Sequence, residues 1–154
     1  MTMALAVPQG FPDITGPTNN RRVLDAIVDG LAPLPPSTPG VILPRPQTWS
    51  YASLSGAAQP PAGQTWTPGL AFGGYLTCLI DEYAGLVMLS VLPDSATFLT
   101  AGLAIDLHGP MRAGELAVAA DVIRLTGRDA TVEVTLAQHD RIVSLATVRH
   151  VIRR

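Results

Sequence analysis

The sequence has no lysine, a single cysteine and no block of basic residues. Its ten basic residues are all arginines, and with twelve acidic residues they give a formal net charge of −2. We expect no nucleic-acid partner, because phosphate binding needs clustered positive charge. Cys78 alone excludes an internal disulfide bond and a multi-cysteine metal site. No His or Cys pair has the spacing of metal ligands, so we expect no bound metal.

Charged residues are scarce as well, at 14% of the chain, whereas 47% of the residues are hydrophobic. This composition indicates a well-buried globular protein, and the apolar excess suggests a homodimer or homotetramer. The one apolar run that resembles a membrane span, residues 69–92, carries Asp81 and Glu82 at its middle. Each carboxylate there would cost about 3 kcal/mol in lipid. The N-terminus also lacks the positive region of a signal peptide, so we expect a cytoplasmic protein without a membrane partner.

The first 47 residues read as an N-terminal arm. Residues 1–17 show no usable period, and Thr18 could cap a helix that runs to Leu31, with apolar residues spaced along one face. The following segment, up to residue 47, is too rich in proline for a packed helix or an inner strand. We predict an extended surface connector there.

Residues 48–154 read as a separate α+β domain. The segment 73–92 is nearly continuous helix former, opened by two glycines and closed by Pro93, and its apolar character on most faces predicts a buried helix. In the strand after this helix, Leu99, Leu103 and Leu107 belong to one alternating apolar row. Short turns between strands favour an antiparallel meander. The expected strands cover residues 48–56, 99–107, 116–125, 130–136 and 142–152, and residues 57–69 are expected to form a loop.

The segment FGGYLTCLIDEYAGL, followed by this meander, resembles the hotdog-fold thioesterases of the phenylacetate-pathway (PaaI-like) and 4-hydroxybenzoyl-CoA type. In that family, His-Gly-Gly opens the central helix and an acidic residue follows seven positions after the second glycine. Here Gly73 and Gly74 are the glycines, and Asp81 is the acid. The resemblance covers residues 48–152. It implies a hotdog fold, in which a five- or six-stranded antiparallel sheet wraps a long central helix.

The resemblance also implies an acyl-CoA or acyl-carrier thioesterase. Asp81 would then act as base or nucleophile, and the amides of Gly73 and Gly74 would bind the oxyanion at the helix N-terminus. No cofactor is expected, since coenzyme A would be part of the substrate. Two other interpretations stay open: the glycines form only a tight turn into the helix, or Asp81 is an exposed or interface acid. Glu82 is expected to be solvated or at an interface, and Cys78 to be a buried hydrophobe.

Two residues depart from the family pattern. Phe72 stands where the family has its histidine, and Trp66 stands where Asn or Gln is common. We expect both aromatic rings either to line an acyl pocket or to belong to the core. Their presence favours an alternative function, a non-catalytic hotdog protein that binds an acyl or aromatic ligand or has a structural role. A dehydratase ranks last, because the loop before the helix lacks the histidine that such enzymes use.

Arginines around Gly127 are a further candidate for substrate binding. Arg124 and Arg128 flank this predicted hairpin, and guanidinium groups bind phosphates in a bidentate manner. Arg128 is therefore predicted to contact the coenzyme A phosphates. The alternative is that both arginines are simply solvated.

Overall fold

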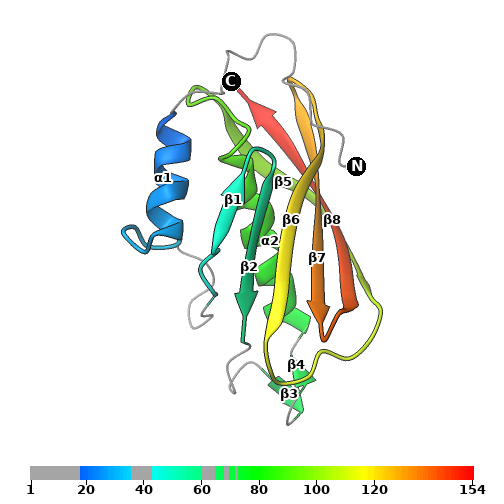
Figure 1. Cartoon of the computed structure of the whole chain (residues 1–154). Coiled ribbons are helices and arrows are strands. Elements are labelled where there is room, and N and C mark those ends of the chain that lie inside the picture. The colour runs from blue at the N-terminus through cyan, green and yellow to red at the C-terminus, as the bar shows by residue number, and fades with distance from the viewer. Residues whose placement is uncertain (1–17, 36–42, 60–64, 68–69, 72) are drawn as a thin grey trace.

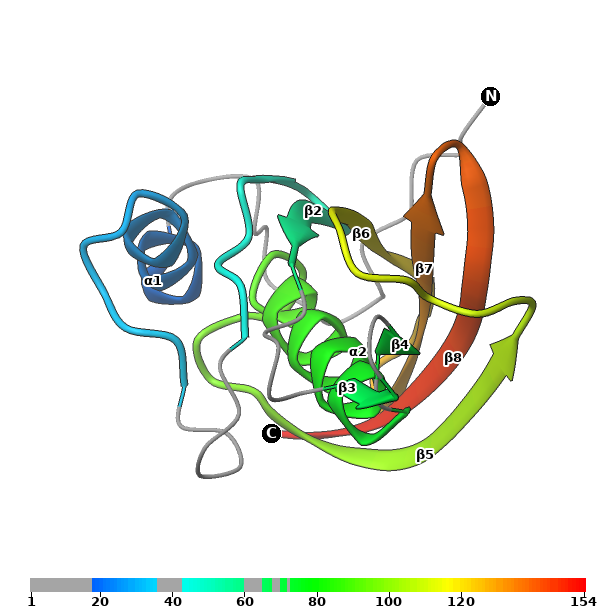
Figure 2. The same cartoon turned by 90° about the horizontal axis from the view of Figure 1, so that it is seen from below.

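The protein is built from one curved antiparallel sheet around one helix (Figure 1). A computed structural model describes residues 18–35, 43–59, 65–67, 70–71 and 73–154. The view along the molecule in Figure 2 shows α2 on the concave side of the sheet. This confirms the predicted α+β class and hotdog architecture. The elements are α1 (Asn19–Val28), β1 (Thr48–Ser50), β2 (Ser53–Ala58), β3 (Thr65–Thr67), β4 (Leu70–Ala71), α2 (Gly73–Met88), β5 (Thr97–Leu107), β6 (Leu116–Leu125), β7 (Asp129–Gln138) and β8 (Arg141–Arg153).

The six strands of the sheet follow the order β1-β2-β6-β7-β8-β5, and every neighbouring pair is antiparallel. Strands β6, β7 and β8 form the predicted meander. β5 was expected to pair with β6 but pairs with β8 instead, because the connection over residues 108–115 is too long for a tight hairpin and crosses the end of the sheet (Figure 2). β5 is thereby an edge strand. β3, within the segment 57–69 predicted to be a loop, forms a separate pair with β4, which directly follows that segment.

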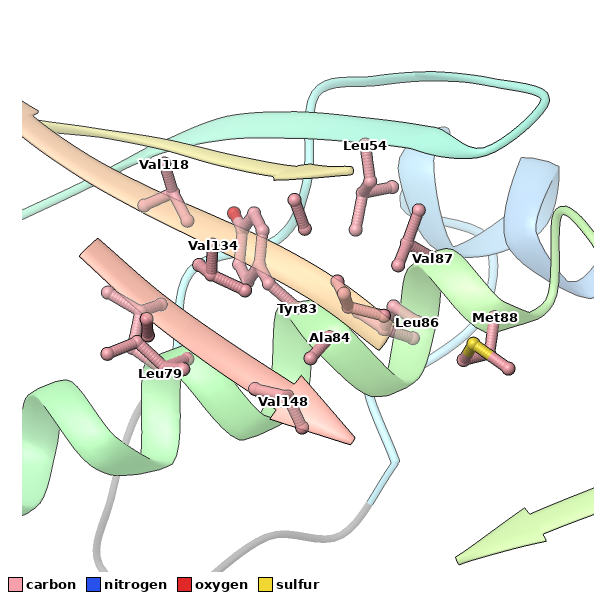
Figure 3. Packing of buried hydrophobic residues seen from close by; sticks show 14 of the residues in the cluster. Leu54, Leu79, Tyr83, Ala84, Leu86, Val87, Met88, Val118, Val134 and Val148 are labelled. Carbon is pink, nitrogen blue, oxygen red and sulfur yellow. The ribbon is translucent and has the colours of Figure 1, made fainter. Parts of the chain in front are cut away.

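The core lies between α2 and the concave face of the sheet. Nine of the 16 residues of α2 are buried, as predicted for a helix that is apolar on most faces. Along β7, buried and partly buried residues alternate strictly, which is the period of a strand with one face on the core. Figure 3 shows Leu79, Tyr83 and Val87 of α2 among the buried side chains that pack between the helix and the sheet.

The predicted strand 48–56 is a hairpin of two strands. β1 and β2 pair antiparallel around the turn at Tyr51 and Ala52. Ala52 has a φ of 64°, which side chains rarely adopt. Its backbone N–H donates a 2.9 Å hydrogen bond to the hydroxyl of Ser90, which follows α2. A contact remote in the sequence thus holds this turn in place.

A bulge changes the facing of side chains along β5. The register with β8 shifts between Thr100 and Gly102. Leu99 therefore pairs with Val151, on the convex face, whereas Leu103 pairs with the buried Val148, on the concave face. The prediction that these leucines share one row was wrong, because one extra residue reverses the side-chain facing of the residues beyond it.

Helix α1, predicted as part of an N-terminal arm, packs on the same core. Its Leu24 and Ile27 are buried, and Thr18 caps it, as predicted, by accepting a 3.2 Å hydrogen bond from the N–H of Arg21. The backbone N–H groups of Asn19 and Asn20 each donate a 2.9 Å hydrogen bond to the Asp94 carboxylate. The predicted loose arm over residues 1–17 lies outside the described residues. None of the helices described is long and apolar enough to cross a lipid bilayer.

Candidate active site

Gly73 and Gly74 open helix α2 at one end of the sheet. The first N–H groups of a helix have no partner within the helix, and the helix dipole makes them a favourable place for a negative charge. Among the residues that the structure describes, a Cβ atom added at Gly73 would meet no atom within 4 Å.

Asp81 lies two turns further along α2, facing the edge strand. Its carboxylate accepts a 3.0 Å hydrogen bond from the hydroxyl of Thr100 on β5. Both residues line a cavity of about 240 Å³ between α2 and β5. The other lining residues are mostly apolar: Pro35, Glu82, Gly85, Leu86, Leu89 and Phe98. Asp81 is thus exposed, but it stands at a cleft whose walls suit an apolar group.

Glu82 is a second carboxylate of the same cavity. One of its oxygens, Oε1, is buried and has no hydrogen-bond partner among the residues described. Burial, and then the neighbouring charge of Asp81, raise the pKa of this carboxyl above its ordinary value. We expected Glu82 in solvent or at an interface, and within the single chain it lies in the wall of the cavity. The spacing from Glu82 to Leu86 and Leu89, four and seven residues, is the signal that could have placed it there.

His150 lies directly behind this cavity and is fully buried. Its ring packs edge-on against Phe98 with centroids 5.0 Å apart. Nε2 lies 3.2 Å from the carbonyl oxygen of Ala84, so Nε2 carries the proton of this hydrogen bond. Burial lowers the pKa of His150, and the neutral ring supports the cavity wall without adding charge. Sequence analysis gave it no role, because strand position alone does not reveal contact with the helix.

Of the three predicted binding residues, the structure describes the side chain of Arg128 alone. Phe72 lies outside the described residues, and Trp66 belongs to β3, where the description covers the backbone only. Arg128 is exposed in the turn between β6 and β7, at the opposite end of the sheet from the start of α2 (Figure 1). Its neighbour Arg124 forms a 2.8 Å ion pair with Asp129. Neither arginine lies near Gly73 within one chain.

Other candidate chemistry is limited in the part of the chain that the structure describes. It contains no group of three or more His, Cys, Asp or Glu side chains that could hold a metal ion. Cys78 is partly buried on α2. The two features able to support acyl chemistry are therefore the amides at the start of α2 and the carboxylates in the cavity.

Solved structures with the same fold come from several bacteria. A phenylacetic acid degradation-related protein from Ralstonia eutropha is 21% identical over 83% of this chain and 98% of its own, with a TM-score of 0.69. A conserved protein from Pseudomonas aeruginosa is 21% identical over 70% and 86% of the two chains, with a TM-score of 0.65. A hypothetical thioesterase from Streptococcus pneumoniae, solved with coenzyme A, is 19% identical over 71% and 84%, with a TM-score of 0.65.

A family model agrees with these structural matches, although no curated protein has a matching sequence. The family model for the acyl-CoA thioesterase N-terminal domain matches residues 62–151, which is more than half of the 154 residues. This range contains α2 with its paired glycines, the carboxylates of the cavity and most of the sheet. The chain belongs to the acyl-CoA thioesterase family of hotdog-fold proteins.

Proposed function

We propose that this protein hydrolyses acyl thioesters of coenzyme A or of an acyl carrier. Asp81 acts as the base that activates water or as the nucleophile, and the amides of Gly73 and Gly74 stabilise the oxyanion. The observation that carries the proposal is the Asp81 carboxylate, held by Thr100 at an apolar-walled cavity on the same helix whose N-terminus bears the glycines. The coenzyme A bound by the Streptococcus pneumoniae protein supports this class of substrate.

The proposed hydrolysis uses water, the Asp81 carboxylate and the N–H groups at the start of α2. Water adds across the carbonyl–sulfur bond, so that the acyl group leaves as a carboxylic acid and the sulfur leaves as a thiol. Asp81 takes the proton of water, or attacks the carbonyl carbon to form an anhydride that water then cleaves. In either route the carbonyl oxygen becomes negative, and N–H groups at a helix end stabilise that charge.

Helix geometry supports a site to which two chains contribute. Asp81 follows Gly73 by eight residues, which is about 12 Å of helix rise. The N–H groups of the first turn point away from Asp81, beyond the helix end. An oxyanion donor and a nucleophile on one carbonyl span less than about 8 Å. We therefore propose that Asp81 of one chain faces the Gly73 and Gly74 amides of a second copy.

The edge of the sheet offers a place for that second copy. β5 has 11 residues, and among the strands that the structure describes it pairs with β8 alone. Leu103 and Leu107 are 38% and 60% exposed. Their partners in β8, Val148 and Ser144, are buried, so these leucines face the concave side, beyond the cover of α2. An edge with unpaired backbone groups and exposed leucines favours association. We infer a homodimer formed through β5, or a homotetramer built from such dimers.

One alternative has specific support. Phe72 and Trp66 stand where the family has hydrogen-bonding side chains. A protein that binds an acyl or aromatic ligand without hydrolysing it would need the apolar cavity and not the polar groups. The two functions differ in whether the thioester bond is cleaved.

A thiol-release assay tests the proposed function. Purified protein is offered a panel of aliphatic and aromatic acyl-CoA thioesters and one acyl-carrier thioester, and we expect turnover of at least one. Asp81→Asn should abolish that turnover while the melting temperature is retained. No turnover of any substrate above the buffer rate would favour the non-catalytic alternative. Turnover that survives Asp81→Asn would remove Asp81 from the mechanism.

A further inference from the structure

The cavity between α2 and β5 has a third wall, which comes from the N-terminal part of the chain. Most of the lining residues that the structure describes belong to β5, to α2 or to the turn that ends α2. The exception is Pro35, which follows α1. Pro35 is exposed to solvent and lines the cavity at the same time. It therefore stands at the rim.

The segment that carries Pro35 is stiff. Pro33 and Pro35 alternate with Ala32 and Leu34. A proline ring fixes its own φ and also keeps the residue before it out of the helical region, in an extended conformation. This segment has few conformations to lose when a ligand arrives, so the rim is already formed in the free protein.

The same segment is anchored to the body of the domain. The guanidinium of Arg45 donates a 2.5 Å hydrogen bond to the carbonyl oxygen of Ala32, and the side chain of Leu34 packs against the hydrophobic core. Helix α1, which comes before the segment, is held to the end of α2, because Arg21 donates hydrogen bonds of 3.3 and 3.1 Å to the carbonyl oxygen of Ser90. The backbone of the rim thus has a fixed position beside α2.

Two contacts across the cavity give its direction. Asp81 of α2 accepts the hydrogen bond from Thr100 of β5. One helical turn further on, Gly85 faces Phe98, since an added Cβ would lie 3.7 and 3.8 Å from two atoms of the Phe98 ring. The last lining residue in this direction is Leu89. The cavity therefore follows one face of the helix from Asp81 to Leu89, over about 12 Å of rise.

The cavity is small for an acyl site. Its volume of about 240 Å³ lies below the roughly 300–1,000 Å³ of sites for drug-sized ligands. A group the size of a water molecule occupies roughly 30 Å³ of a liquid, so there is room for about eight such groups. Gly85 contributes to this space, although glycine destabilises a helix relative to alanine.

We propose that Pro35 is a specificity-determining residue, whose ring limits the acyl group in this cavity to about eight carbon atoms. This rests on the proposed function and narrows it to thioesters of short acyl groups. The carbonyl carbon lies at Asp81, and the acyl chain extends past Gly85 toward Leu89. A longer chain would meet the proline ring or would leave its last carbons in water, where they add no affinity.

Binding of ligands that cannot be hydrolysed tests this proposal. Titration calorimetry is done with S-alkyl thioethers of pantetheine, the arm that coenzyme A and acyl carriers share, with alkyl chains from four to fourteen carbons. Wild-type affinity should rise about fourfold per CH₂ group and level off near eight carbons. For Pro35→Gly, the rise should continue for at least two more carbons. Pro33→Gly removes an exposed ring that does not line the cavity. This matched control should level off where the wild type does.

A second variant should move the limit in the opposite direction. Gly85→Ala adds a methyl group in ordinary contact with Phe98, and its affinity should level off one or two carbons earlier than that of the wild type. The melting temperatures of all variants are measured to show that each one folds.

Three results would overturn the role of Pro35: the same limit in Pro35→Gly as in the wild type, an equal shift in Pro33→Gly, or no binding of any thioether by the wild type. Hydrolysis of acyl-CoA thioesters without a limit in chain length would also overturn it and leave the hydrolase. The expected binding series without turnover of any thioester would support the rim and overturn the hydrolase.

Discussion

The hydroxyl of Thr100 donates a 3.0 Å hydrogen bond to the carboxylate of Asp81 and so links the edge strand to the central helix. Thr100 is the last residue before the bulge in β5, and both residues line the same cavity. A carboxylate with one oxygen held in this way keeps its orientation while the other oxygen is available to substrate or water. We therefore expect Thr100 to position Asp81 in the proposed reaction.

Replacing Thr100 by Val keeps the shape of the side chain and removes the hydroxyl. We expect kcat/KM to fall about tenfold, the usual effect of losing a hydrogen bond to a charged group, with the drop mainly in kcat. Thr97→Val, on the exposed start of the same strand, is the matched control and should keep full activity. Steady-state kinetics of the two variants test whether the Thr100 hydroxyl orients Asp81. Equal rates for both variants would show that Asp81 is oriented without Thr100.

A mixed-subunit experiment tests whether the site uses two chains. Gly73→Pro removes one N–H at the first helical position, which tolerates proline, and Gly73→Ala keeps the amide at a position where a Cβ meets no atom within 4 Å. Gly73→Pro and Asp81→Asn should each be inactive alone. Dissociated and reassociated together at equal amounts, they should recover about a quarter of the wild-type activity, because half of the dimers are mixed and each holds one intact site.

The Gly73→Ala protein serves as the control and should stay active throughout. A site built within one chain predicts no recovery in the mixture, since neither chain then carries both groups. That outcome would contradict the two-chain arrangement.

Two of the three exposed leucines of β5, Leu99 and Leu103, allow the proposed association surface to be tested apart from the opposite face of the strand. Leu103→Arg places a charge on the concave side, and we expect it to give a monomer without activity. Leu99→Arg alters the convex side of the same strand and should leave the dimer intact. Both leucines are exposed, at 38% and 56%, so neither change disturbs the core of a single chain. Sedimentation equilibrium measures the mass, and a dimeric Leu103→Arg protein would exclude association through this edge.

Stability should depend on pH through Glu82. Burial and the charge of Asp81 raise its pKa in the folded state above the ordinary 4.5. The folded state then holds a proton that the unfolded state has released, so stability falls as pH rises from 4.5 through the raised pKa. Glu82→Gln removes this loss of stability, because the glutamine side chain does not ionise. The variant should melt at a higher temperature than the wild type at neutral pH and match it below pH 4.5. A difference in melting temperature between variant and wild type that stays constant with pH would show that ionisation of Glu82 is not the cause.

The regular parts of this fold follow from local sequence, and the irregular parts do not. The apolar surface of α2 and the alternation along β7 predict a buried helix and a strand from residue period alone. The turn at Ala52 carries no glycine or asparagine to mark it, and the Ser90 hydroxyl that stabilises it lies 38 residues away. The bulge in β5 escaped prediction because Leu99 and Leu103 fit one alternating row until the pairing with β8 is known.

The candidate site also has parts that local sequence predicts and parts that it does not. The spacing from Gly74 to Asp81 identified the helix and its acid, because both lie on one element. The hydrogen bond from Thr100, and the His150 ring behind Phe98, arise from the packing of α2 against β5 and β8. Contacts between elements distant in the chain have no local signature. Glu82 is an exception, since its spacing to Leu86 and Leu89 along the chain is a local signal for its place in the cavity wall.

The two edges of the sheet are unequal, and this limits growth by strand addition. One edge is the 11-residue β5, and the other is β1, with three residues. Pairing of β5 with the β1 edge of another molecule would repeat head to tail and build a filament. A strand of three residues, however, can form few hydrogen bonds with β5. Self-pairing of β5 about a two-fold axis uses the long edge on both molecules at once. In the proposed dimer, assembly along the sheet would therefore stop at two molecules, because the short β1 is the remaining edge of the described sheet.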